Sequence, residues 1–130
     1  MATDALLSLQ PLTTKTATFS GAAFFLAGGT RRRGLKVRVI YSAAQNATGS
    51  NTVIFSVDVS KDGGVTYYTE FQTDPITLST TVQAGQVHIP FEVSPTSVVN
   101  GIYIRTTATI AGAGTGPSVA YQCDIDLGRP

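Results

Sequence analysis

Apolar residues recur at every second position along most of this chain, and this pattern restricts the fold more than any other feature. Residues 53–59 place three valines and a phenylalanine on one side and polar residues on the other, as expected for a strand with one buried face. The same period occurs in residues 35–42, 67–71, 76–79, 87–93, 102–110 and 119–127. No segment shows a convincing helical period with capping residues. The sequence therefore predicts an all-β protein.

Short turn motifs separate these segments and indicate how the strands are arranged. Asp62-Gly63-Gly64, Asp74-Pro75 and Asn100-Gly101 are residue combinations that favour turns. The Gly-rich residues 111–117 predict a hairpin loop between the last two strands. Pro90 cannot donate to a ladder, so it predicts an edge position or a bulge. Six or more short strands with turns at this spacing predict an antiparallel β-sandwich of jelly-roll-like type.

The chain of 130 residues suits one sandwich domain over residues 1–130, with a less regular N-terminal segment at 1–34. Residues 5–12 are apolar but contain Pro11, and residues 22–27 are apolar enough to form a further strand. Two interpretations stay open for this segment. It forms an extra strand or two plus an arm that reaches a neighbouring subunit, or both of its strands complete the sandwich.

The charge content argues against several classes of partner. Charged residues make up 13% of the chain, and nine Lys and Arg against eight Asp and Glu leave a net charge of +1. Nucleic-acid-binding proteins usually carry a basic excess, so we expect no nucleic acid partner. No stretch approaches the roughly 20 apolar residues of a membrane span, and we expect no membrane partner. The neutral polar surface suits contact with proteins, because few ions are desolvated there.

Residues 1–4 lack a basic segment followed by a long apolar run, so we expect no signal peptide and synthesis in the cytoplasm. The single cysteine allows no internal disulfide and fits folding in a reducing compartment.

Candidate catalytic and metal-binding residues are few. His88 is the only histidine, so no two-histidine metal site exists. For the same reason, no His-based catalytic triad can be assembled with a second base. The strand pattern points His88 outward and Cys123 inward, which separates the one conceivable nucleophile and base pair. Asp124 and Asp126 lie on one face about 7 Å apart; we interpret them as solvated surface, with weak calcium binding as the alternative. We expect no enzyme activity and no cofactor.

One local motif has a defined pattern. Residues 60–67, Ser-Lys-Asp-Gly-Gly-Val-Thr-Tyr, resemble the Asp-box of sialidases and other β-propellers, where the box is structural and lies away from the active site. We predict a hairpin in which Ser60 and Asp62 bond to the loop backbone, Gly63 and Gly64 take positive φ, and the aromatic ring packs under the turn. The motif occurs once, whereas a propeller repeats its units. It therefore predicts no glycosidase activity.

The densest charge in the chain is a run of three arginines between glycine-containing segments. Guanidinium groups fit carboxylates and phosphates, so the run either docks against an acidic or phosphate-bearing surface or lies in a solvated loop. We combine it with apolar residues near the N-terminus as predicted contacts for a partner. These residues are Arg31, Arg32, Arg33, Leu6, Leu7 and Leu9.

Several of these segments together carry a resemblance to a known class of proteins. The start Met-Ala-Thr-Asp, with a short apolar segment, precedes Arg33-Gly34-Leu35-Lys36-Val37 and the strand and hairpin of 55–67. Ile-Tyr-Ile-Arg-Thr at 102–106 and the Gly-rich stretch leading to Val-Ala-Tyr at 119–121 follow. This pattern resembles the small β-sandwich virion proteins of tailed bacteriophages that are encoded near the major capsid protein.

The resemblance covers roughly residues 33–127 and implies a head decoration, or capsid cement, protein. It implies a homo-oligomer, often a trimer, that binds the major capsid protein where capsomers meet. The protein would be made in the host cytoplasm and lie on the capsid surface of the virion. The segment before Arg31 departs from this pattern in its length.

The alternative is a glycan-binding or host-surface-binding module of a phage tail or fibre. A module of that kind predicts an exposed aromatic platform. Tyr68 and Tyr103 are the tyrosines whose alternation points outward.

Overall fold

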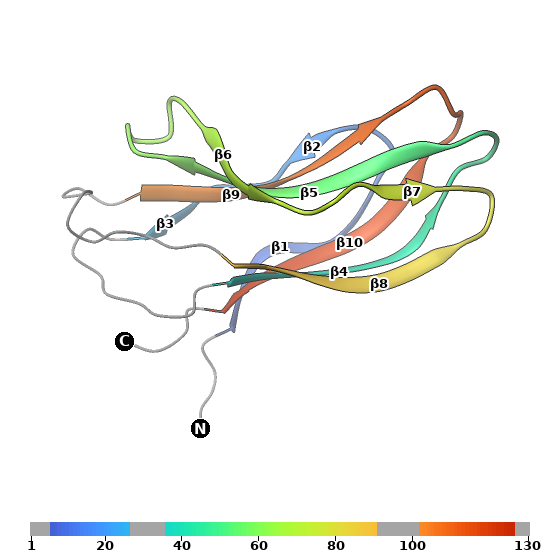
Figure 1. Cartoon of the computed structure of the whole chain (residues 1–130). Helices are drawn as coiled ribbons and strands as arrows, with labels where there is room; N and C mark the ends of the chain where they lie inside the picture. The colour runs from blue at the N-terminus through green and yellow to red at the C-terminus, as the bar shows by residue number, and fades with distance from the viewer. Residues whose placement is uncertain (1–5, 27–35, 91–101, 127–130) are drawn as a thin grey trace.

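The computed structural model describes residues 6–26, 36–90 and 102–126. These residues form strands and connecting loops, and the strands build two antiparallel sheets that pack face to face (Figure 1). Within those ranges no helix forms, and hence none is long and apolar enough to cross a membrane. The predicted all-β antiparallel sandwich is confirmed.

The strands divide between the two layers as follows. Sheet A has the order β1 (Leu6–Lys15), β10 (Ser118–Asp126), β4 (Lys36–Gln45) and β8 (Gln83–Pro90). In sheet B, β2 (Phe19–Ser20) and β3 (Phe24–Leu26) lie along one edge of β9 (Ile102–Ala111). The other side of β9 pairs with β5 (Asn51–Ser60), whose outer edge carries β6 (Tyr68–Gln72) and β7 (Ile76–Leu78).

The connectivity is that of a jelly roll. If β2 with β3, and β6 with β7, each count as one interrupted strand, both sheets have four positions. Numbered along the chain, these positions follow the orders 1-8-3-6 in sheet A and 2-7-4-5 in sheet B. Such interleaving of two sheets is the arrangement of double-sheet jelly rolls.

One predicted connection is wrong. Residues 111–117 were expected to form a hairpin, but β9 belongs to sheet B and β10 to sheet A, so this segment crosses between the layers. It lies against residues 46–50, which make the neighbouring crossing, and the Gly114 N–H donates to the Ser50 carbonyl at 3.2 Å. A Gly-rich sequence suits both kinds of connection, because both need compact backbone turns.

The core fills the space between the sheets with the inward residues of the alternating segments. It consists of Leu9, Val37, Val39, Ala44, Val53, Phe55, Val57, Val59, Leu78, Ile89, Ile102, Ile104, Ala108, Val119, Tyr121, Cys123 and Ile125. Phe55 lies at its centre, with ring centroids 6.0 Å from Tyr41 and 5.2 Å from Tyr121. Burying one large apolar side chain contributes about 2 kcal/mol, so the two layers are held together mainly by this set.

The N-terminal strand β1 pairs with β10 along its whole length, from Leu6 opposite Asp126 to Lys15 opposite Val119. Leu9 is only 5% exposed and packs in the core. The interpretation in which this part of the chain completes the sandwich therefore holds for residues 6–15.

Candidate functional site

The predicted contact residues are not brought together by the described part of the structure. Arg31, Arg32 and Arg33 lie outside the described residues. Leu6 and Leu7 belong to β1, but only their backbone is described. Leu9 was expected at a partner surface, whereas its side chain is buried in the core, because it points to the inner face of sheet A. The remaining candidate side chains lie on the outer faces of the two sheets.

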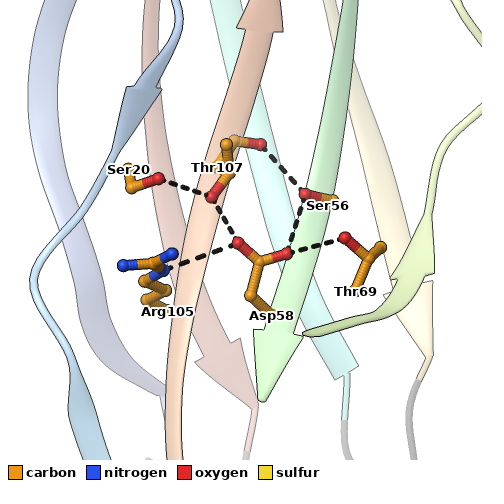
Figure 2. A network of polar contacts seen from close by, with 6 residues as sticks. All are labelled: Ser20, Ser56, Asp58, Thr69, Arg105 and Thr107. Carbon is orange, nitrogen blue, oxygen red and sulfur yellow. Dashed lines mark hydrogen bonds and ion pairs between the residues drawn. The ribbon is translucent and has the colours of Figure 1, made fainter. Parts of the chain in front are cut away.

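The most developed polar cluster lies on the outer face of sheet B and is centred on Asp58 (Figure 2). Oδ1 of this carboxylate accepts hydrogen bonds from Ser56 Oγ and Thr69 Oγ1, each at 3.2 Å. Oδ2 accepts one from Thr107 Oγ1 at 2.5 Å. Arg105 Nε lies 3.5 Å from the same oxygen and forms an ion pair with it. Although Asp58 is only 7% exposed, its charge is thus well compensated.

Strand register explains why these residues meet. The pairing of β5 with β9 sets Asp58 opposite Arg105 and Ser56 opposite Thr107, and the pairing of β5 with β6 sets Asp58 opposite Thr69. Opposite charges and hydroxyl pairs on one face of neighbouring strands stabilise a sheet by roughly 0.2–1 kcal/mol each. The cluster therefore joins three strands.

The network extends to a fourth strand through Ser20 on β2. Ser20 lies opposite Thr107, and their hydroxyl oxygens are 3.0 Å apart. Since Thr107 uses its hydrogen for Asp58, Ser20 donates to Thr107. We call Ser20, Ser56, Asp58, Thr69, Arg105 and Thr107 the Asp58 network. Each carboxylate oxygen of Asp58 has two partners, and these partners come from β5, β6 and β9. The contacts of Asp58 are therefore those of a residue that holds the sheet together.

Aromatic side chains lie beside this network on the same face. The guanidinium carbon of Arg105 is 3.9 Å from the centroid of the Tyr67 ring, a cation–π contact. Phe25 on β3 and Tyr103 on β9 are opposite each other, with ring centroids 5.1 Å apart and planes inclined at 50°. Phe25 is 49% exposed. We call Phe25, Tyr67, Tyr103 and Arg105 the aromatic patch.

The predicted platform of Tyr68 and Tyr103 does not form. Tyr68 pairs with Val59, a core residue, and therefore lies on the inner side of sheet B at its edge. Tyr103 lies on the outer face. Tyr68 is nevertheless 41% exposed, because β6 is an edge strand with no further strand of sheet B beside it among the described residues.

The Asp-box-like hairpin has the predicted hydrogen bonds. Ser60 Oγ donates to Asp62 Oδ1 at 2.7 Å and accepts from the Gly64 N–H at 2.9 Å. Asp62 Oδ1 also accepts the N–H groups of Val65 at 3.2 Å and Thr66 at 2.9 Å. The backbone bond from Thr66, followed by the bond from Ser60, lowers the pKa of Asp62 from 3.8 to about 2.

The glycines and the aromatic residue of this hairpin also take their predicted places. Gly63 and Gly64 have φ values of 81° and 89°, which favour glycine. The Tyr67 hydroxyl is 3.4 Å from the position that a Cβ on Gly64 would occupy, so the ring lies against the turn. The hairpin thus fixes Tyr67 where it stacks on Arg105.

The remaining candidates lie on sheet A. Asp124 forms an ion pair with Arg38 at 2.9 Å and its side chain is 17% exposed, so it is less solvated than expected; the side chain of Asp126 lies outside the described residues. His88 is exposed and Cys123 is buried, as predicted, and burial raises the pKa of the thiol to about 12. In the part of the chain that the structure describes, no three His, Cys, Asp or Glu side chains gather as metal ligands.

Comparison with known proteins supports the fold. No family model matches the chain, and no curated protein matches it. A chain in the structure of infectious bursal disease virus, Gx strain, aligns over 92% of this chain and 30% of its own length, at 11% identity and a TM-score of 0.52. A chain in the structure of the Gt strain aligns over 92% of this chain and 32% of its own length, at 7% identity and a TM-score of 0.52. This chain therefore spans about a third of those viral chains, and the likeness shows a shared sandwich fold.

A family 11 carbohydrate-binding module from Clostridium thermocellum, in complex with a β-1,3-1,4-mixed-linked tetrasaccharide, is also similar. It covers 98% of this chain and 91% of its own, at 13% identity and a TM-score of 0.44. A score this low supports no conclusion beyond the likeness itself.

Proposed function

We propose that this chain is a bacteriophage capsid decoration (cement) protein that binds the outer surface of the head and stabilises capsomer junctions. The observation that carries the proposal is the outer face of sheet B. There a buried carboxylate pairs with Arg105 and accepts hydrogen bonds from three hydroxyl groups, and the exposed Phe25 ring packs on the partly buried Tyr103 beside it. The partners we propose are the major capsid protein and further copies of this chain.

The Asp58 network lowers the desolvation cost of covering this face with another protein. Desolvating an unpaired ion costs several kcal/mol, whereas an internally paired carboxylate has already lost most of its water. The hydroxyl groups that surround it are neutral and hydrogen-bonded. A face of this kind suits permanent contact with a protein surface.

The aromatic patch supplies the contact energy that such a face needs. Aromatic side chains and arginine dominate the binding energy of many protein interfaces. Phe25, at 49% exposure, has apolar surface to bury, and Tyr103 supports its ring at a centroid distance of 5.1 Å. The jelly-roll connectivity supports the proposal further, because this architecture is used in viral capsid domains.

Binding to shells tests the proposal. The purified chain is mixed with shells assembled from the major capsid protein of the proposed source phage, and bound chain is measured by co-sedimentation. We expect the chain to bind and to raise the temperature at which shells break. Phe25→Ser combined with Tyr103→Ser should weaken binding at least about tenfold, while Val82→Ser, at a site 58% exposed in the loop between β7 and β8, should not.

Two results would count against this function. The first is a folded wild-type chain that does not sediment with shells. The second is unchanged binding by the Phe25 and Tyr103 variant, which would remove the outer face of sheet B as the contact. Replacing Arg31, Arg32 and Arg33 with Ser tests their predicted contact separately, because that segment contributes no residue to the aromatic patch.

A second candidate is a glycan-binding module of a tail or fibre. The observation in its favour is that the exposed Phe25 ring lies on the same face as the hydroxyl groups of Ser20 and Thr107. Aromatic rings cover the apolar faces of sugars, and hydroxyl groups bond to their edges. Glycan-array screening of the wild-type chain decides this candidate: binding lost in Phe25→Ser would support it, and an array without signal would remove it.

A further inference from the structure

The four sheet edges in the described residues differ in how well they are protected against pairing with another strand. Strand β1 contains Pro11 and two register shifts against β10. One edge of sheet B is broken between β2 and β3 by residues 21–23, and the other is broken between β6 and β7 by residues 73–75. Prolines, bulges and interruptions are the usual means by which proteins prevent edge-to-edge association.

The fourth edge, β8, has these devices only at its ends: a register shift against β4 between Gln83 and Gly85, and Pro90 as the last residue. Its sequence Gln-Ala-Gly-Gln-Val-His-Ile-Pro contains no Asp, Glu, Lys or Arg. Six consecutive residues, from Gly85 opposite Tyr41 to Pro90 opposite Lys36, pair with β4 in unbroken register. No strand of the described residues pairs with the other side of β8. Its outward N–H and C=O groups thus form a regular template for a further strand.

We propose that β8 pairs antiparallel with β8 of a second copy of this chain about a two-fold axis at Val87, so that sheet A continues across the dimer. In this register Val87 lies opposite the second copy's Val87, and Gly85 lies opposite Ile89. On the outer face Gln86 lies opposite His88. A two-fold interface presents the same surface twice and must be complementary to itself.

The side chains of β8 meet that requirement. Gln86 Nε2 and His88 Nε2 are already 3.1 Å apart within one strand, although their backbones are two residues, or about 7 Å, apart. Directly opposite residues in an antiparallel pair are closer, about 5 Å between Cβ atoms. The same two side chains therefore reach each other across the axis, twice per dimer. On the inner face, Ile89 is buried in the core of its own chain and the Tyr41 ring fills the space beside Gly85, so neither residue obstructs the second copy. No like charges face each other.

This inference does not depend on the proposed function. The β8 edge belongs to sheet A, whereas the aromatic patch lies on the outer face of sheet B (Figure 1). A dimer through β8 leaves both copies of that face free to bind, which would give attachment to a shell two contact points. Failure of the shell-binding assay would leave the dimer intact, and a monomeric chain could still bind shells.

Sedimentation equilibrium of the full chain at micromolar concentration tests the dimer. We expect a mass of twice 13.6 kDa. Gln86→Lys with His88→Lys places two directly opposed pairs of like charges at the axis and should raise the dissociation constant at least about tenfold. Gln86→Glu with His88→Glu should act in the same way. Mixing the two variants should restore association, because opposite charges then face each other.

The control adds two lysines at exposed positions away from β8, Thr109→Lys with Ala113→Lys, and should remain dimeric. Circular dichroism checks that each variant is folded, and restored association on mixing shows that both β8 variants are folded. A wild-type monomer, a trimer or larger assembly, dimers of the lysine variant, or equal dissociation of the control would each overturn the proposal.

Discussion

Removal of the Asp58 carboxylate should destabilise the fold by about 3 kcal/mol. In Asp58→Ala, the hydroxyl groups of Ser56 and Thr107 lose their acceptor, and Arg105 loses its counter-ion. A hydrogen bond to a charged acceptor contributes about 1.5–3 kcal/mol. The exposed Thr69 and the half-buried Arg105 regain water in the variant, so we count mainly the two less exposed hydroxyl groups.

Asp58→Asn separates the acceptor from the shape of the side chain. The amide keeps one oxygen, which we expect to face Arg105, because a guanidinium group has no acceptor and cannot adapt to an NH2 group. The NH2 group then faces Ser56 and Thr69, whose hydroxyl groups can rotate and accept. The variant should therefore lose about 1 kcal/mol, clearly less than Asp58→Ala.

Urea unfolding followed by circular dichroism measures both variants at pH 7. Asp124→Ala is the matched control, because it removes a carboxylate with a single ion pair, to Arg38, whose side chain is 31% exposed. That pair should contribute less than about 1 kcal/mol. A cost for Asp58→Ala equal to that of Asp124→Ala, or smaller than that of Asp58→Asn, would refute the reasoning.

Three further predictions concern single side chains. Bonds from Thr66 and Ser60 lower the pKa of Asp62 from 3.8 to about 2. The carboxylate therefore stabilises the fold fully above pH 3.8, and this stabilisation is lost as the pH falls through 2. The unfolding midpoints of the wild type and Asp62→Asn should differ at pH 7 and converge near pH 2. Burial raises the pKa of Cys123 to about 12, so a thiol reagent at pH 8 should label native protein no faster than it unfolds; rapid labelling would contradict this burial. The Tyr121 hydroxyl is buried without a hydrogen-bond partner in the described residues, so Tyr121→Phe should leave the unfolding free energy unchanged or raise it by about 1 kcal/mol; a loss above about 1 kcal/mol in urea unfolding would show a missed partner.

The strands were predictable because their alternation is local, whereas the assignment of strands to sheets was not. Residues 53–59 identify β5 by their own pattern. Whether residues 111–117 turn back or cross to the other sheet depends on their contact with residues 46–50, which lie far away in the sequence. Pro11 lies within strand β1. It is tolerated because β1 lies at an edge, where one N–H needs no partner.

The site was partly visible in the sequence. Asp58 and Arg105 are each the one charged residue at an outward position of an otherwise neutral strand, and opposite signs on two such strands are a signal that they pair. The strand register that brings them together does not follow from either strand alone. The prediction that Tyr68 points outward was wrong for a related reason. Its side of the sheet depends on how β6 pairs with β5, and that pairing contains a register shift beside Asp58.

The low charge content and the Asp58 network are connected by the cost of covering a surface. If Asp58 and Arg105 were far apart on this face, each would have to lose its water separately when a partner docks, at several kcal/mol per ion. Pairing them within the sheet moves that cost to the folding step, where three hydroxyl groups offset it. Arg105→Ser should therefore lower both the stability of the fold and the affinity of this face for a covering protein. It leaves a buried anion with fewer partners, and it gives any protein that covers sheet B an uncompensated charge to desolvate.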